Sequence, residues 1–247
     1  MNLYTLHSNP ETLIGYDVAI RVPEIAWGVY KDNPDKLREL ENLWAQSAET
    51  SLKYATDVLN DRFPQGEKAI AKSGSDSYTY AKNVLKDKFP MGEKAIAKSA
   101  SDSYEYAKNV LNDRFPPGEK AIATHPEYSN QYAREVLKPL GIKGFPLGEP
   151  AIAAVPWHSY YYATEILNDR FPIGEKAIAT SASDSYYYAK NVLNDRFPPG
   201  EKAIAKSASD SYTYARDVLK DRFPPGEDVI RGSQYQERYE ELFGVKL

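Results

Sequence analysis

The amino-acid sequence predicts an all-α solenoid, in which two-helix units of 26 residues stack into a curved rod or superhelix. Three observations predict this fold. Nearly the same segment recurs along the chain, each copy combines a short and a longer helical pattern, and a proline turn separates the copies. In arrays of this kind each repeat buries its apolar face against its neighbours, so repetition itself stabilises the fold.

The repeat is marked by a Phe-Pro dipeptide, whose phenylalanine recurs at Phe63, Phe89, Phe115, Phe145, Phe171, Phe197 and Phe223. The spacing is 26 residues, except that a four-residue expansion within 115–144 lengthens one unit. Residues 40–62 align without a gap to 66–88, so a diverged unit begins near Leu37. The sequence therefore predicts seven full repeats over residues 37–222.

The two ends of the chain depart from the repeat consensus. Terminal units of a stacked array are atypical because their outer faces meet water. We therefore expect an amino-terminal capping segment at 1–36 and carboxy-terminal capping helices at 223–247.

The longer helix of each repeat has apolar residues at helical spacing, as at Tyr212, Ala215, Val218 and Leu219. Ser207 and Asp210 have the spacing of a capping box, which predicts a helix of about 13 residues starting there. Two divergent repeats place Pro126 and Pro156 at the first helical position, where proline is favoured. We expect each helix to stop before Phe-Pro, because the residue preceding a proline avoids the α region.

The shorter helix is carried by the Gly-Glu-Lys-Ala-Ile-Ala segment. Its glutamate comes early and its lysine late, as the helix dipole favours, and Pro150 confines the helix start in one repeat. We expect about two turns, partly 3₁₀. Isolated helices this short are marginal in water, so both helices of a repeat depend on burial against the next repeat.

Composition excludes several classes of protein. The chain has 247 residues, a net charge of -4 and no cysteine, so disulfides and thiolate metal sites are excluded. Interleaved charges give neither the basic footprint of a general nucleic-acid binder nor the dense negative charge of a DNA mimic. No apolar run reaches membrane-spanning length, and the amino-terminal residues lack a signal or transit pattern, so we expect a cytoplasmic protein.

Enzymatic signals are weak. The histidines are His7, His125 and His158, without metal-ligand spacing, and no dinucleotide, P-loop or nucleophile-elbow motif occurs. His125 stands where other repeats have the capping serine. The acidic residues recur in every repeat, which indicates solvated faces and helix-end charges. We predict no enzyme, no cofactor and no metal site.

Two central repeats, beginning at Phe115 and Phe145, differ most from the others. Their substitutions are of types common in protein interfaces. Together with the position between the two repeated tyrosines, they give the predicted partner-binding residues His125, Tyr128, Gln131, Trp157, His158, Tyr160, Tyr161 and Tyr187. The alternative explanation is that these repeats are older and the flanking ones are recent duplications.

The 20 tyrosines allow a second function. Three successive tyrosines on a helix cannot all face the core, so exposed rings could stack nucleotides or single-stranded nucleic acid. Against this, the position between the repeated tyrosines varies among Thr79, Glu105, Gln131, Tyr161, Tyr187 and Thr213. A homodimer held by salt bridges between the Lys- and Asp-rich segments of the second helices is a third possibility.

The pattern FPxGEKAIA followed by SYxYAKNVL resembles a group of 26-residue helical repeats in tailed-phage proteins of unknown function. The resemblance covers residues 37–222 and is greatest in 145–170. It implies an α-helical repeat fold and suggests a phage origin, without any catalytic or binding motif. With the divergent central repeats, it leads us to expect a non-enzymatic scaffold that engages or inhibits a host protein of defence or replication in the host cytoplasm.

Overall fold

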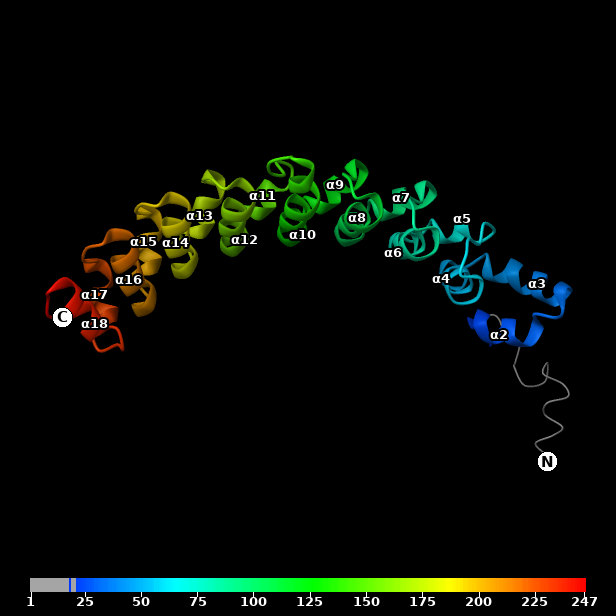
Figure 1. The fold of residues 1–247 in the computed structure, drawn as a ribbon, viewed down its shortest axis with the longest axis horizontal. Coiled ribbons are helices and arrows are strands. Elements are labelled where there is room, and N and C mark those ends of the chain that lie inside the picture. The colour runs from blue at the N-terminus through cyan, green and yellow to red at the C-terminus, as the bar shows by residue number, and fades with distance from the viewer. Residues whose placement is uncertain (1–17, 19–20) are drawn as a thin grey trace, which may run out of the picture. The chain divides into compact units, whose positions relative to one another are not determined.

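The computed structural model describes residue 18 and residues 21–247. His7 and much of the expected amino-terminal capping segment lie outside the described residues. The chain divides into two compact units, 1–121 and 122–247, which we describe separately. The described part of each unit consists of helices and connecting turns without any strand, which confirms the all-α repeat solenoid (Figure 1). Each repeat is named below by the phenylalanine of its Phe-Pro dipeptide.

The short first helices begin at or just after this dipeptide. Two of them start with a 3₁₀ turn, η9 (Pro172–Gly174) and η12 (Pro224–Gly226), as the sequence predicts. Before the Phe63 repeat lie α2 (Pro23–Tyr30) and α3 (Pro34–Trp44). The first helices that follow are α5 (Glu67–Ile70), α7 (Pro90–Ile96), α9 (Pro116–Ile122), α11 (Glu149–Ile152), α13 (Glu175–Ile178), α15 (Pro198–Ile204) and α17 (Glu227–Ile230).

The longer second helices start as α-helix and widen into a π-helix. The α-helical parts are α4 (Ala48–Lys53), α6 (Gly74–Thr79), α8 (Ala100–Tyr106), α10 (Pro126–Tyr132), α12 (Pro156–Tyr161), α14 (Ala182–Tyr188) and α16 (Ala208–Tyr214). The π-helical parts are η3 (Tyr54–Leu59), η4 (Tyr80–Leu85), η5 (Ala107–Leu111), η6 (Ala133–Leu137), η8 (Tyr162–Leu167), η10 (Ala189–Leu193) and η11 (Ala215–Leu219). The last helix is α18 (Gln236–Phe243).

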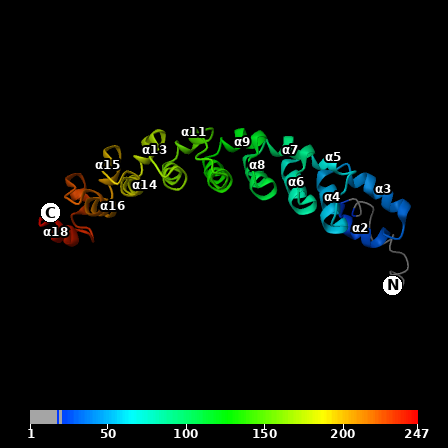
Figure 2. The same ribbon diagram turned by 45° about the horizontal axis from the view of Figure 1, so that its top comes forward.

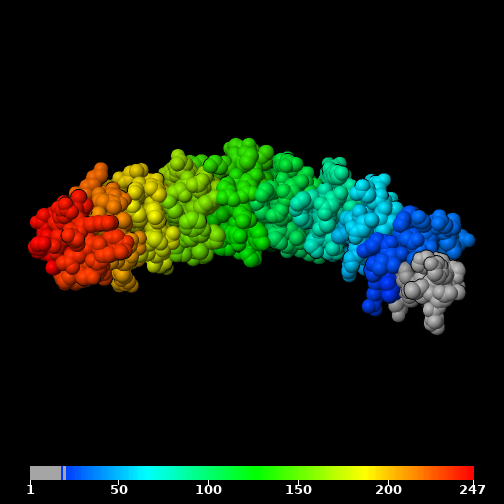
Figure 3. Space-filling view, turned by 60° about the horizontal axis from the view of Figure 1, so that its bottom comes forward, coloured from blue at the N-terminus to red at the C-terminus, as the bar shows by residue number. Residues whose placement is uncertain are grey.

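Neighbouring repeats stack through like elements. In the first unit α4, α6 and α8 pack in succession, and in the second unit α10, α12, α14 and α16 do the same (Figures 1 and 2). Within each unit, successive repeats therefore form neighbouring bands across the surface (Figure 3). Among the described residues, no helix combines the length and apolar character needed to cross a bilayer.

The helix starts agree with the sequence predictions. The Ser207 hydroxyl accepts a hydrogen bond from the Asp210 amide at 3.3 Å. Pro126 and Pro156 are the first residues of α10 and α12. His125 occupies the N-cap position of α10, as expected, but its side chain makes no capping hydrogen bond.

The second helices end before Phe-Pro, as predicted, but the left-handed residue that ends them was not foreseen. The second helices stop at a residue in the left-handed conformation, such as Asn194 (φ 52°) or Lys220 (φ 54°), before the chain reaches Phe-Pro. In the expanded repeat Lys138 stays right-handed, and the helix continues through the 3₁₀ turn η7 (Lys138–Leu140) to Gly141 at φ 77°. The four extra residues therefore lengthen the helix end and move the left-handed residue.

A buried tyrosine links the two helices of each repeat. In the Phe171 repeat the Tyr188 hydroxyl accepts from the Phe171 amide at 3.1 Å and donates to the Glu175 carboxylate at 2.8 Å. Arg170 also pairs with Glu175, and the Tyr188 ring packs against Phe197 of the next repeat with ring centroids 5.2 Å apart. The glutamate of each first helix thus lies in the first turn, as expected, and also belongs to the network that joins the two helices.

The carboxy-terminal segment keeps this network. Tyr239 on α18 accepts from the Phe223 amide at 2.7 Å and donates to Glu227 at 3.0 Å. Arg222 pairs with Glu227 at 2.8 Å. The segment that begins at 223 therefore repeats the core contacts of a full unit with a shorter, diverged second helix.

Candidate functional site

The predicted partner-binding residues lie on three neighbouring second helices of the second unit. α10, α12 and α14 pack side by side, so residues about 26 to 31 positions apart in the chain become neighbours. Helix α12 contributes half of them, and its repeat departs from the consensus at the exposed Trp157 and the half-buried His158.

Four of the predicted residues form one aromatic patch, consisting of Trp157, Tyr160, Tyr161 and Tyr187. The Trp157 ring lies 6.2 Å from Tyr160 and 5.7 Å from Tyr161, measured between ring centroids. Tyr160 lies 6.1 Å from Tyr187 of the next repeat. Trp157 is 54% exposed and Tyr187 46% exposed, so the patch offers large aromatic rings to solvent.

A groove adjoins the aromatic patch between α10 and α12. It encloses about 250 Å³ and is lined by Glu127, Asn130, Gln131, Arg134, Trp157, His158 and Tyr161. The structure thus brings Gln131 and His158 together with Trp157 and Tyr161 of the aromatic patch.

The groove depends on Asn130, which the sequence analysis missed. Asn130 stands where five other repeats have the first tyrosine of Tyr-x-Tyr-Ala and the first repeat has Leu52, so the smaller amide leaves space beside α12. The available signal was this single departure from the repeat. Asn130 is buried, and its side-chain oxygen Oδ1 has no hydrogen-bond partner among the described residues.

Asn130 also determines which ring nitrogen of neutral His158 carries the proton. Its Nδ2 donates to His158 Nδ1 at 3.1 Å and to the His158 carbonyl at 3.2 Å. Nδ1 is therefore an acceptor, and the proton of the neutral ring lies on Nε2. Burial lowers the pKa of His158. The negative charge of the nearby Glu127 raises this pKa, but by less than burial lowers it.

The groove also carries charged groups. Arg134 lies over the Tyr161 ring, 5.5 Å from its centroid, and hydrogen-bonds to the Tyr161 hydroxyl. Arg134 pairs with Glu135 on its own helix, and Glu127 accepts a hydrogen bond from Gln131 at 3.4 Å. The guanidinium therefore belongs to the wall of the groove and holds Tyr161 in place.

The remaining predicted residues lie apart from the groove. His125 and Tyr128 pack edge to face against each other, with ring centroids 5.6 Å apart, and neither lines the groove. Within the described residues, no cluster of three or more acidic or histidine side chains has the arrangement of a metal site.

Comparison with known proteins gives no relative. The chain matches no protein-family model, no curated protein and no solved structure. The functional argument therefore depends on the geometry of the residues themselves.

Proposed function

We propose that the protein is a non-enzymatic scaffold that binds a protein partner through the aromatic patch and the adjoining groove. The supporting observation is the continuous ring contact from Trp157 through Tyr160 to Tyr187, with exposed rings at both ends. Tryptophan and tyrosine are enriched among the residues that dominate binding energy in protein interfaces.

The alternative, a tyrosine-lined binder of nucleotides or single-stranded nucleic acid, needs exposed rings along the whole array. The second tyrosine of each Tyr-x-Tyr-Ala, for example Tyr188, is fully buried. The first tyrosine is covered by a basic side chain in four repeats, for example Tyr186 by Lys190. These arrangements favour a local protein interface over a ladder of stacked bases.

The resemblance to tailed-phage repeat proteins suggests a bacterial host protein as the partner. The proposal includes action as an inhibitor or adaptor of a host defence or replication factor in the host cytoplasm. Bacterial lysate is therefore the appropriate source of binding partners.

The test compares capture of bacterial proteins by wild-type chain and by a double variant, Trp157→Ser with Tyr187→Thr. Both replacements occur at the same positions of other repeats, so the helices should be unaffected. We expect the variant to lose the captured protein by at least about tenfold. Ile173→Gln is the matched control, because Ile173 is 55% exposed but lies outside the aromatic patch and the groove.

A second comparison replaces residues 115–170 by two consensus repeats. Helix content should be retained while partner capture is abolished. Equal capture by the wild type and both variants would contradict the proposed surface. Titration with mixed oligonucleotides tests the alternative, which predicts salt-sensitive quenching of tryptophan fluorescence.

A further inference from the structure

A basic side chain covers the first tyrosine of Tyr-x-Tyr-Ala in four repeats. In the Phe171 repeat, Lys190 Nζ lies 5.6 Å from the Tyr186 ring centroid and donates to the Tyr186 hydroxyl at 3.1 Å. Lys190 also pairs at 2.8 Å with Asp217 of the next repeat. The corresponding pairs are Lys82 over Tyr78, Lys108 over Tyr104 and Arg216 over Tyr212.

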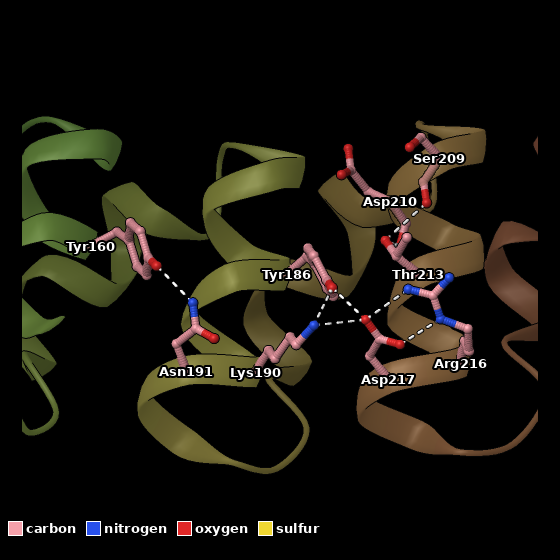
Figure 4. Close-up of polar contacts among 9 residues, drawn as sticks. All are labelled: Tyr160, Tyr186, Lys190, Asn191, Ser209, Asp210, Thr213, Arg216 and Asp217. Carbon is pink, nitrogen blue, oxygen red and sulfur yellow. Dashed lines mark hydrogen bonds and ion pairs between the residues drawn. The ribbon is translucent and has the colours of Figure 1, made fainter.

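The Phe145 repeat keeps the tyrosine but lacks the basic residue. Thr164 stands at the position of Lys190, and its hydroxyl turns back to the carbonyls of Tyr160 and Tyr161 at 3.1 Å. Asn191 stands at the position of Asp217 and donates to the Tyr160 hydroxyl at 2.8 Å. Figure 4 shows this junction beside the one that contains Tyr186, Lys190 and Asp217.

The shorter threonine side chain leaves a pocket, here called the Thr164 pocket. It encloses about 460 Å³ and is lined mainly by Tyr160, Thr164, Glu165, Asp169, Asn191 and Asn194. Its location matches the place where a lysine chain extends in the next repeat.

The charges of the Thr164 pocket favour a cation. Glu165 and Asp169 contribute two carboxylates, and among the described residues no basic side chain forms an ion pair with Glu165. Lys138 reaches the backbone of Glu165 and donates to its carbonyl oxygen at 2.7 Å. An ammonium over Tyr160 would combine the attraction of the ring face with that of the two carboxylates.

We propose that the Thr164 pocket receives a lysine or arginine side chain of the protein partner. This inference rests on the proposed function, because Tyr160 belongs to both the aromatic patch and the pocket. A partner that packs against Trp157 and Tyr187 places its chain beside the pocket. The incoming cation takes the role that Lys190 has over Tyr186 within the chain.

The probe for this site is Nα-acetyl-lysine N-methylamide, which carries the side chain without a partner protein. We expect saturable NMR shifts of the amides at 160–169 and 191–194 at millimolar concentration. The norleucine analogue has the same apolar stem without the ammonium and should cause no saturable shift. Equal shifts from both analogues would overturn the proposal.

Three variants then assign the site. Thr164→Lys supplies the basic residue of the other repeats, and we expect the lysine analogue to lose its shifts and the captured partner to bind about tenfold more weakly. Thr164→Val keeps the size of the threonine side chain and adds no charge, so this variant should bind the analogue as the wild type does. Lys190→Thr should create a second set of shifts around Tyr186.

The outcomes separate this inference from the proposed function. If Thr164→Lys loses analogue binding but captures the partner at wild-type strength, the pocket lies outside the interface and the inference is overturned. The proposed function would then stand on the Trp157 and Tyr187 variants alone. Undiminished analogue binding by Thr164→Lys would refute the pocket itself.

Discussion

Gly200 lies directly against Ser185, the buried serine of the preceding repeat. A β-carbon built on Gly200 would lie 2.4 Å from Ser185 Oγ and 2.6 Å from Phe197 Cδ1. Ser185 cannot easily turn away, because its hydroxyl donates to the Ile178 carbonyl at 2.9 Å. The glycine of FPxGE is therefore required for close packing between repeats.

Gly200→Ala should accordingly destabilise the fold by about 1–3 kcal/mol, the usual cost of overpacking a core. Gly28→Ala is the control, because Gly28 lies inside α2 with no atom within 4 Å of its β-carbon position. That change should stabilise its helix by about 0.5–1 kcal/mol. Urea denaturation followed by circular dichroism measures both effects, and equal effects of the two substitutions would contradict this account.

Lys86→Asn should raise stability by about 0.5 kcal/mol, because asparagine tolerates the left-handed conformation better than lysine. Lys86 has φ 52°, and Asn112 and Asn194 already occupy the equivalent positions at φ 50° and 52°. Lys138→Asn is the matched control, since Lys138 has φ -60°. Thermal denaturation should show a gain for the first variant only.

Tyr188→Phe should cost about 1–3 kcal/mol, because it leaves the buried Phe171 amide and the Glu175 carboxylate without the hydroxyl that joins them. Tyr187→Phe changes an exposed neighbour on the same helix and should leave the denaturation midpoint unchanged. A loss of equal size in both variants would show that the hydroxyl network contributes little.

Alkaline pH should unfold the protein through these buried tyrosines. Burial raises the pKa of Tyr80, Tyr188, Tyr214 and Tyr239 to about 12. The folded pKa exceeds the ordinary value near 10, so the contribution to stability is complete below pH 10 and is lost as pH rises through 12. Denaturation midpoints measured from pH 8 to 12 should fall above pH 10, and the fall should be smaller in Tyr188→Phe.

Acidification should lower the free energy of unfolding through protonation of His158. Burial lowers its pKa below the ordinary 6.5, so the folded state binds the proton less readily than the unfolded state. Its contribution to stability is therefore complete above about pH 6.5 and declines as pH falls below that value. His158→Gln should have a smaller difference in unfolding free energy between pH 7.5 and 5.5 than the wild type, and equal differences would exclude this role.

The sequence was sufficient to predict two helices in each repeat and the start of the second one, but not the π-helix in which that second helix ends. Ser207 and Asp210 specify the start of α16 within four residues of chain, and Pro126 and Pro156 do the same for α10 and α12. Comparison of the repeats also drew attention to Trp157 and Tyr187, because departures from a consensus are visible without a structure.

By itself, then, the sequence determined the repeat, its helices and a set of unusual side chains. Only the tertiary structure decided that Asn130 opens a groove, that Thr164 leaves a pocket beside Tyr160, and that Gly200 must lack a side chain. The physical reason is the sequence separation over which each interaction acts. Caps and helical periodicity act over a few neighbouring residues, whereas these features arise where one repeat packs on another, and a contact such as Tyr160 with Asn191 joins residues 31 positions apart.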